Sequence, residues 1–347
     1  MSFITIKKTG FLMGLLAGMA LTIAGLPEPA ESGKVAHIKI NAQPVDFAPY
    51  DSAHVRFGKL EWRGGLLLTS THEHFGGFSG LVLDRSGKNM VAITDRGWWM
   101  SAALEYRNNK LSGIKNARFA KLLNARSKPF KGKRWRDSES IIALGRGRNL
   151  SRLLISFERR HRILQYAFGK HGLRATGHRI KTPRDLEHLE YNKGLEAIAE
   201  FGKNTILKGA VIALSERTLD ANGNIRGWIL SGPYKGALSV RRSNDFDLTD
   251  AETLPNGDLL ILERKVSMLT GLEFRIRRIA AVTIRPGAVL DGPVLIESGM
   301  QNTVDNMEGM SLHVAPDGEL RLTLISDDNF SLLQRTLLLQ FALPGKP

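Results

Sequence analysis

Apolar and polar residues alternate in one recurring pattern: an acid or serine precedes an apolar run, and a second apolar run ends in an acid. The copies of this pattern begin at Ser79, Glu139, Glu196, Glu252 and Glu308. Successive starts lie 60, 57, 56 and 56 residues apart, by subtraction of these numbers. A fixed period of this length indicates a repeat architecture in which each copy is one structural unit.

The second apolar run of each copy is followed by a carboxylate, and in most copies by Arg as well. These acids are Asp95, Glu158, Glu216, Glu263 and Asp327. The remaining apolar runs are short, rich in β-branched and aliphatic residues, and bounded by turn signals such as Asp220–Gly223 and Pro255–Asp258. One helix is predicted, over Pro183–Tyr191, as a short insert.

About four short strands per period is how a β-propeller blade is built. We therefore predict an all-β protein with a β-propeller fold of five blades, one for each visible repeat. Residues 35–78 and 335–343 could instead complete a sixth blade. The apolar segment 337–343 has no partner downstream, so we expect the N-terminal and C-terminal strands to pair and close the ring without exposed edges.

The N-terminal segment reads as a targeting signal and not as part of the fold. Lys7 and Lys8 precede the apolar stretch Phe11–Leu26, which is short for a membrane span. We predict a signal peptide at 1–24, a linker at 25–34 and a propeller domain at 35–347. The expected location is the periplasm or the outside of the cell, with no membrane span after cleavage.

The composition of the chain excludes some kinds of site and favours some kinds of partner. The chain has no cysteine, which excludes disulfides, thiolate metal sites and a cysteine nucleophile. Its net charge is +15, from 49 Lys and Arg against 34 Asp and Glu, which favours anionic partners. The basic run Lys128–Arg136 matches no nucleic-acid-binding motif, so we predict a solvated loop there and no specific nucleic acid partner. The expected partner is a small anionic molecule bound by a monomer.

The acids of the repeats carry the candidate chemistry. In a propeller the equivalent residues of all blades meet around the central channel. Carboxylates gathered there must bind cations, pair with Arg or hold protons. Hard oxygen ligands of this kind suit Ca²⁺. The alternative interpretation is that Glu and Arg pair between blades and only hold the propeller together.

Several segments resemble the bacterial phytase-like family, which is named for the esterase-like activity of phytase. The resemblance runs from about residue 60 to 343. It is carried by Phe75–Leu81, Asp95–Gly97, Asn192–Glu196, Leu262–Arg264, Asp305–Gly309 and Leu324–Phe330.

This resemblance implies an exported protein that hydrolyses phosphate monoesters of the phytate type with the help of Ca²⁺. The acids expected to bind the metal are Asp305, Glu308, Asp327, Asp328, Glu196 and Glu263. The residues expected to be catalytic are Glu308, Asp327, Glu196 and Arg264. Phosphate oxygens would be bound by Arg96, Arg159, Arg217 and Arg264, since a guanidinium matches them bidentately. The alternative function is a non-catalytic envelope scaffold that binds a protein or an anionic polymer.

Three other motifs support weaker hypotheses. His72-Glu73-His74 lacks the His-Glu-x-x-His spacing of zinc proteases and is predicted to be a polar loop. Trp98 and Trp99 could face a sugar or inositol ring, although packing at a blade edge is favoured. Ser79 stands where other repeats have Glu, but no Gly-x-Ser-x-Gly turn surrounds it, so a serine esterase has no support.

Overall fold

A computed structural model of the protein describes residues 33–145 and 150–344. The predicted signal peptide at 1–24 and nearly all of the predicted linker lie outside these residues. The described residues fall within one compact unit, Ser32–Pro347. β-strands account for almost all of its regular structure, as the alternation of apolar and polar residues predicts.

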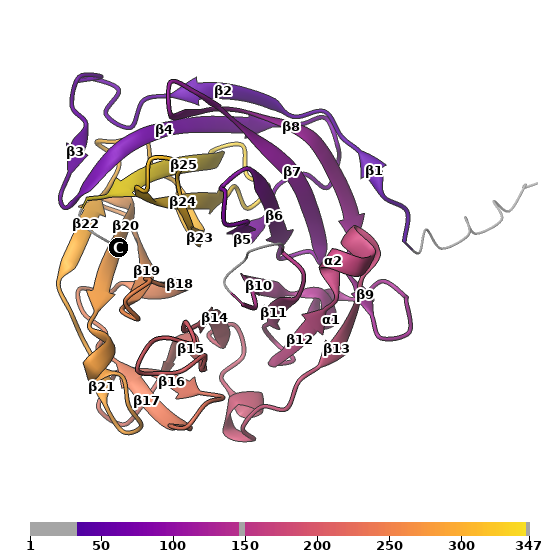
Figure 1. Ribbon diagram of the computed structural model, residues 1–347, viewed down its shortest axis with the longest axis vertical. Helices are drawn as coiled ribbons and strands as arrows, with labels where there is room; N and C mark the ends of the chain where they lie inside the picture. The colour runs from indigo at the N-terminus through magenta and orange to yellow at the C-terminus, as the bar shows by residue number, and fades with distance from the viewer. Residues whose placement is uncertain (1–32, 146–149, 345–347) are drawn as a thin grey trace, which may run out of the picture. The chain divides into compact units, whose positions relative to one another are not determined.

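The strands form five sheets, which are the blades of a propeller (Figure 1). From the axis outward, blade 1 consists of β5 (Phe78–Leu83), β6 (Asn89–Thr94), β7 (Trp98–Arg107), β8 (Lys110–Lys121) and β1 (Ala36–His37). Blade 2 consists of β10 (Ser138–Ala143), β11 (Leu153–Phe157), β12 (Arg162–Tyr166), β13 (Thr176–Arg179) and β9 (Leu123–Asn124). Blade 3 consists of β14 (Leu195–Glu200), β15 (Val211–Leu219), β16 (Ile225–Ile229), β17 (Gly236–Val240) and β21 (Val289–Leu290). Blade 4 consists of β18 (Asp247–Thr253), β19 (Leu259–Ser267), β20 (Gly271–Ile279) and β22 (Val294–Ser298). Blade 5 consists of β23 (Asn306–Val314), β24 (Leu320–Asp327), β25 (Thr336–Leu343), β4 (Leu60–Thr69) and β2 (Asn41–Val45), and β3 (Arg56–Phe57) pairs with β4.

The innermost strands line the central axis. Each of β5, β10, β14 and β18 contacts the innermost strand of the next blade, and β23 contacts β5, so the ring is continuous. The prediction of five blades is confirmed. No sixth sheet occurs in the described part of the chain, because residues 35–78 add β1 to blade 1 and β2, β3 and β4 to blade 5.

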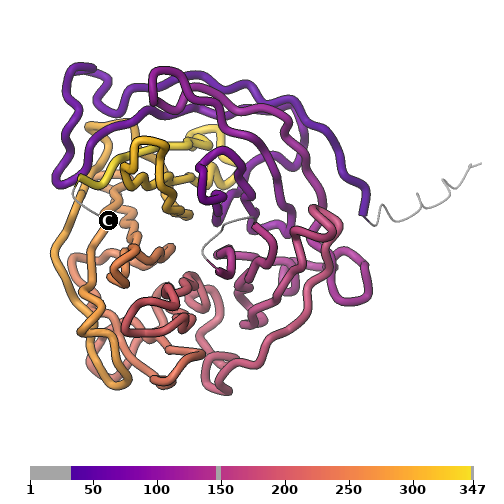
Figure 2. Tube along the Cα trace, viewed as in Figure 1, coloured from indigo at the N-terminus to yellow at the C-terminus, as the bar shows by residue number. Residues whose placement is uncertain are grey.

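Blade 5 closes the ring by pairing the C-terminal strand with an N-terminal strand. β25 pairs with β24 on one side and antiparallel with β4 on the other, so that Leu338 lies opposite Leu66. Figure 2 shows the indigo N-terminal strands running beside the yellow C-terminal strand. The predicted closure by terminal strands is therefore confirmed.

Apolar side chains fill each interface between neighbouring blades, with one cluster for each of the five junctions. Alternation along β25 sends Leu338 into the cluster shared with blade 1 and Leu339 into the cluster shared with blade 4. The junction of blades 4 and 5 also holds aromatic rings, with Phe47 and Phe341 centred 4.9 Å apart. These clusters fix the angle at which each blade meets the axis.

Helical structure is limited to single turns between strands. They are α1 (Lys133–Arg136), α2 (Phe168–His171), η1 (Gly172–Arg174), η2 (Asp185–His188) and η3 (Ala281–Thr283). The helix predicted at Pro183–Tyr191 is only the 3₁₀ turn η2. Its Leu186 is buried, and Asp185 accepts a hydrogen bond from the Trp228 indole nitrogen at 2.7 Å.

Shortening a buried side chain of β25, the strand that closes the ring, tests the importance of ring closure. Leu338→Ala leaves a cavity between blades 5 and 1 at a side chain that is 0% exposed. We expect it to lower the free energy of unfolding by about 2–5 kcal/mol in urea titration. The matched variant Leu333→Ala, at a side chain that is 93% exposed, should change it by less than about 0.5 kcal/mol. Equal effects of the two variants would contradict this role of β25.

Candidate functional site

An irregularity at the same place in every innermost strand defines the candidate site. Each of these strands has a register shift just after its start, where one residue, or in β10 both Glu139 and Ser140, has no pair in the second strand. A bulge of this kind bends the strand and redirects the side chain it carries. The residues at the five bulges are Ser79, Glu139, Glu196, Thr249 and Glu308.

The second strand of each blade adds another residue at the same end of the channel. In each blade it is the residue that directly follows, along the chain, the second-strand partner of the inner-strand residue just before the bulge. These positions hold Asp95, Glu158, Glu216, Arg264 and Asp327. With Asp137, which precedes β10, the acids at the two sets of positions form a group that we call the acidic mouth: Asp95, Asp137, Glu139, Glu158, Glu196, Glu216, Glu308 and Asp327.

Blade 4 differs from the sequence prediction by a shift in register. Leu248 pairs with Glu263, so Thr249 and not Glu252 occupies the bulge, and Arg264 and not Glu263 occupies the strand-end position. The assignment of Glu252 to the start of an inner strand was wrong, because Glu252 lies near the end of β18. Blade 4 thus places a cation where the other blades place an acid.

Glu263 is not brought to the acidic mouth. Its side chain is 0% exposed and accepts hydrogen bonds from Arg275 and Arg277, each with Nε at 2.7 Å. Both arginines belong to the neighbouring strand β20 and are themselves buried. A buried carboxylate that is fully paired in this way holds two strands together and has no oxygen left for a metal ion.

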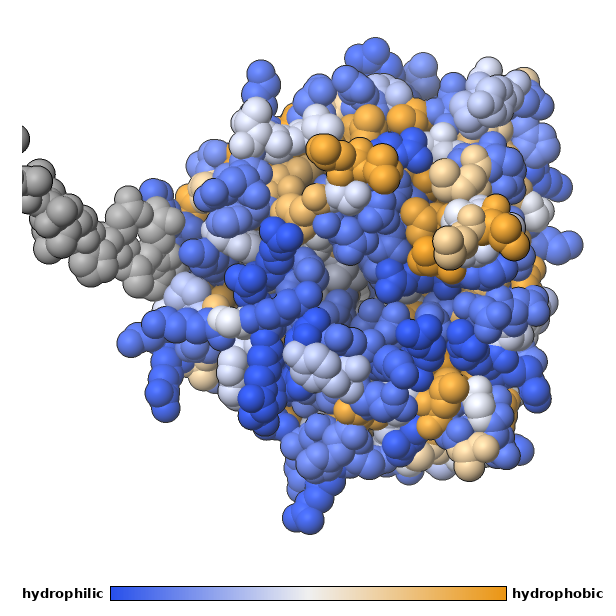
Figure 3. Space-filling view, turned by 180° about the vertical axis from the view of Figure 1, so that it is seen from behind, coloured by the Kyte–Doolittle hydropathy of each residue, from blue (hydrophilic) through white to orange (hydrophobic). Residues whose placement is uncertain are grey.

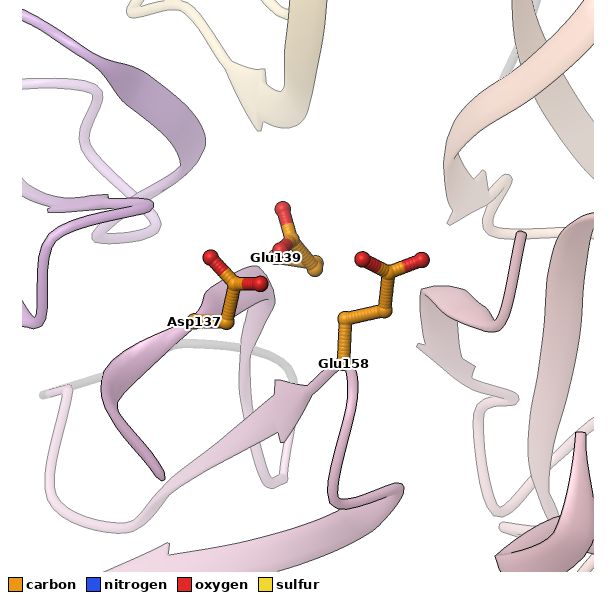
Figure 4. A group of neighbouring side chains, drawn as sticks. All are labelled: Asp137, Glu139 and Glu158. Atoms are coloured by element: carbon orange, nitrogen blue, oxygen red, sulfur yellow. The ribbon is translucent and has the colours of Figure 1, made fainter. Parts of the chain in front are cut away.

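The densest part of the acidic mouth lies on blade 2. Asp137, Glu139 and Glu158 offer carboxylate oxygens that all lie within 4.8 Å of one another, and Figure 4 shows the three side chains converging. The Glu139 and Glu196 carboxylates make no hydrogen bonds with described residues, and Oδ1 of Asp95 is buried without a partner among them. Acids left unpaired at this density need a cation or protons.

Burial and mutual repulsion hold protons on this group. Burial raises the pKa of Glu158 to about 7 and that of Asp327 to about 8, with neighbouring carboxylates adding to the effect. Burial also raises the pKa of Glu308 to about 7, although the charge of Arg264 opposes the rise. The pKa values of Glu139 and Glu196 lie well above their usual range for the same reasons, burial first and then nearby carboxylates.

Arg264 balances one side of the acidic mouth. Its guanidinium donates to Glu308, to Asn306 Oδ1 at 2.6 Å and to Glu216 Oε1 at 3.2 Å. The charges of these carboxylates raise the pKa of Arg264 despite its burial, so it stays cationic. On blade 2, Arg159 donates to Asp137, and the backbone nitrogen of Gly194 donates to Glu158 at 3.0 Å. No hydrogen bond from a described arginine reaches Glu139 or Glu158. The two sides of the mouth are therefore electrostatically unequal.

Two of the predicted metal ligands, Asp305 and Asp328, instead hold loops in place through hydrogen bonds. Asp305 accepts from the backbone nitrogen of Arg335 at 3.0 Å and pairs with its guanidinium. Asp328 accepts from the backbone of Gly77 and Phe330, each at 3.0 Å, and so ties blade 5 to blade 1. The structure brings Glu196, Glu308 and Asp327 to the acidic mouth but does not place Asp305 there.

Of the four predicted phosphate-binding arginines, Arg96 and Arg159 follow the ends of β6 and β11, whereas Arg217 and Arg264 lie within β15 and β19. They also differ in how far their donors are already bonded. Arg217 pairs with Asp247 at 3.0 Å, and Arg159 and Arg264 have the acidic partners given above. Arg96 stacks on the Phe330 ring, with its guanidinium carbon 3.3 Å from the ring centroid. It makes no hydrogen bond with the described residues, so its donors are available to an anion.

The weaker sequence hypotheses gain no support. The Ser79 hydroxyl donates to the Ser138 carbonyl at 2.6 Å, within the junction of blades 1 and 2. Trp99 is buried and donates to the Leu173 carbonyl at 3.1 Å, while Trp98 stacks on Phe119. These residues pack the blades, as the sequence favours.

The opposite end of the channel has a cavity with several apolar residues in its walls. A cavity of about 450 Å³ lies between the far ends of the inner strands, with Ile142, Leu312 and Val314 among its walls. Glu252 and Glu200 line this cavity, which is separate from the acidic mouth. Among the described residues, no helix is long and apolar enough to cross a membrane.

The chain is similar in structure to several solved proteins, each at low sequence identity. A protein described as an oxidoreductase (glucose dehydrogenase) from Thermus thermophilus is 13% identical, with a TM-score of 0.35, over 76% of this chain and 97% of that one. A luciferin-regenerating enzyme is 11% identical, with a TM-score of 0.37, over 78% and 93%. The Dos1 propeller is 10% identical, with a TM-score of 0.33, over 83% and 76%.

No curated protein matches the sequence. The family model described as phytase-like, with the esterase-like activity of phytase, matches residues 73–330. These residues include all five inner strands and every member of the acidic mouth. The chain therefore belongs to the phytase-like family that is defined by this model.

Proposed function

We propose that this protein is an exported esterase that hydrolyses phosphate monoesters at the acidic mouth with the help of Ca²⁺. The observation that carries the proposal is the convergence of Asp137, Glu139 and Glu158, whose oxygens lie within 4.8 Å of one another. Oxygens bound to one Ca²⁺ ion at 2.3–2.6 Å are separated by distances of this order. Membership of the phytase-like family supports the same reaction class.

The donor set fits a hard cation. It consists of carboxylate oxygens, of which those of Glu139 have no partner among the described residues. Asp137, Glu139 and Glu158 would hold Ca²⁺, and Glu196 stands close enough for the charge of Glu139 to raise its pKa further, beyond the effect of burial. When bound, the ion would supply positive charge that neutralises a phosphate ester and polarises it for attack by water.

The other residues of the face fit the remaining tasks. Arg96, held flat by Phe330, is available to bind phosphate oxygens. Asp327 keeps a proton at neutral pH because burial raises its pKa to about 8, and that proton is available to the leaving alcohol. Arg264 keeps Glu308 and Glu216 in place and remains charged.

We further propose that the protein acts as a monomer in the periplasm or outside the cell. The apolar segment that follows Lys7 and Lys8 supports this location. The substrate would be a small phosphate ester, since the net charge of +15 attracts anions over long range. A binding scaffold without turnover is the outcome that would replace the enzyme proposal.

Calcium titration of the folded protein tests the metal site. Saturating Ca²⁺, at about a hundredfold excess over Kd, should stabilise the wild type by about 2.7 kcal/mol relative to chelator. Glu139→Gln should abolish this response while raising the stability of the metal-free protein, because it removes a carboxyl group whose raised pKa makes it take up a proton on folding at neutral pH. Glu105→Gln, at a surface pair with Lys115, should retain the full response. A full response in Glu139→Gln would overturn the assigned site.

The dependence of stability on pH follows from the raised pKa values. Glu158, Glu308 and Asp327 hold protons more tightly when folded, with pKa values of about 7, 7 and 8. Their contribution is present in full below about pH 4 and is lost as the pH rises through 7 and 8. In chelator, the free energy of unfolding should therefore fall by several kcal/mol between about pH 5 and 8.5, because each pKa unit corresponds to about 1.4 kcal/mol. Because Ca²⁺ binds ionised carboxylates, it should offset this fall. An unfolding free energy that rises with pH in chelator would contradict the proton-holding mouth.

Arg96 is the residue to vary for anion binding. Arg96→Gln should raise the KM for p-nitrophenyl phosphate about tenfold or more, as expected for loss of a charged hydrogen bond of about 1.5–3 kcal/mol. The calcium response should stay unchanged in this variant. Arg118→Gln, at an exposed position on β8, is the matched control. Absence of turnover in the wild type on phosphate and carboxylic esters, together with saturable ligand binding, would support the scaffold instead.

A further inference from the structure

Three loops beside the acidic mouth expose large apolar side chains. The β19–β20 hairpin extends past Arg264 and carries Met268 and Leu269 at its tip, 105% and 96% exposed. The β24–β25 hairpin follows Asp327 and carries Leu332 and Leu333, 104% and 93% exposed. Val266 and Met300 are exposed as well. We call these residues the apolar crest: Val266, Met268, Leu269, Met300, Leu332 and Leu333.

The loops of the apolar crest adjoin one another. A Cβ on Gly271, at the base of the first hairpin, would lie 2.7 Å from Met300 Cγ, so the β22–β23 loop lies against that hairpin. The same loop reaches Asp305, which bonds to Arg335 at the base of the other hairpin. On the side of the molecule drawn in Figure 3, apolar residues are most frequent toward the upper right, with a smaller group toward the lower right, and hydrophilic residues cover most of the rest.

A basic segment lies on the other side of the mouth. In a ring of five, blade 2 faces the junction of blades 4 and 5 across the axis. There α1 ends one residue before Asp137, and its Lys133, Arg134 and Trp135 are exposed. The guanidinium carbon of Arg160 lies 5.1 Å from the centroid of the Trp135 ring. We call Lys133, Arg134 and Trp135 the basic turn.

We propose that this face docks on an anionic lipid surface, with the apolar crest inserted among the lipids and the basic turn at the headgroups. Fully exposed leucine and methionine at hairpin tips match insertion into a deformable phase, whereas a protein interface has a closely packed apolar core. Lys and Arg near a bilayer are attracted to anionic headgroups, and Trp favours the interface between water and lipid. The net charge of +15 adds long-range attraction.

Vesicle binding by the purified protein tests the proposal. We expect the protein to sediment with vesicles that contain phosphatidylglycerol, to bind phosphatidylcholine vesicles at least tenfold more weakly, and to lose affinity as salt rises. Leu269→Ser combined with Leu333→Ser should weaken binding at least tenfold. Val282→Ser, at a residue 74% exposed in η3 near the opposite end of the channel, should bind as the wild type does. Lys133→Ala combined with Arg134→Ala should reduce the preference for phosphatidylglycerol.

Thermal unfolding of each variant shows that a loss of binding is not a loss of folding. Failure of the wild type to bind phosphatidylglycerol vesicles would overturn the proposal, as would equal binding by the crest variant. Self-association of the wild type that the crest variant abolishes, without vesicle binding, would assign the apolar crest to contact between two copies instead. Vesicle binding does not depend on calcium or turnover, so its outcome is separate from that of the proposed function.

Discussion

The pairing of β25 with β4 is the interaction on which the rest of the structure depends. Without this antiparallel pairing, β25 would be an exposed sheet edge; with it, a strand from the N-terminal part and the C-terminal strand belong to one blade. Closure forces five inner strands to share an axis. Only then do bulges at equivalent places in those strands point their side chains at a common space. The acidic mouth is thus a product of closure, even though its residues come from every part of the chain.

Closure also explains how the protein tolerates so much unfavourable charge. Carboxylates with raised pKa values, such as Glu139 and Glu196, oppose folding when ionised. The apolar clusters between blades supply the stabilisation that offsets this opposition. Destabilising groups retained at one place are typical of functional sites, where strain and charge serve chemistry and the scaffold supplies stability. The buried Glu263, Arg275 and Arg277 show the contrasting case, a charged group whose members satisfy one another completely.

The repeat period was enough to predict the propeller, its five blades and its closure, because alternation and turn residues are local properties of the sequence. Register is not local. In blade 4 the sequence offers Glu252 and Glu263 at the expected spacing, but pairing between β18 and β19 selects Thr249 and Arg264. Asp137 was missed for a different reason: it precedes an apolar strand and belongs to no repeated position, so only its neighbours in space identify it. Its one signal in the sequence is its spacing of two residues from Glu139.

At the strand-end positions, Arg264 is the one cation among four acids, and this has a consequence for selectivity. A ring made only of acids would present the same face to a guest in any rotation about the axis. With a fixed cation on blade 4 and the tightest set of acids on blade 2, the potential across the opening has a direction. A guest with a positive and a negative end would therefore be held in one orientation, with its negative end on the side of Arg264.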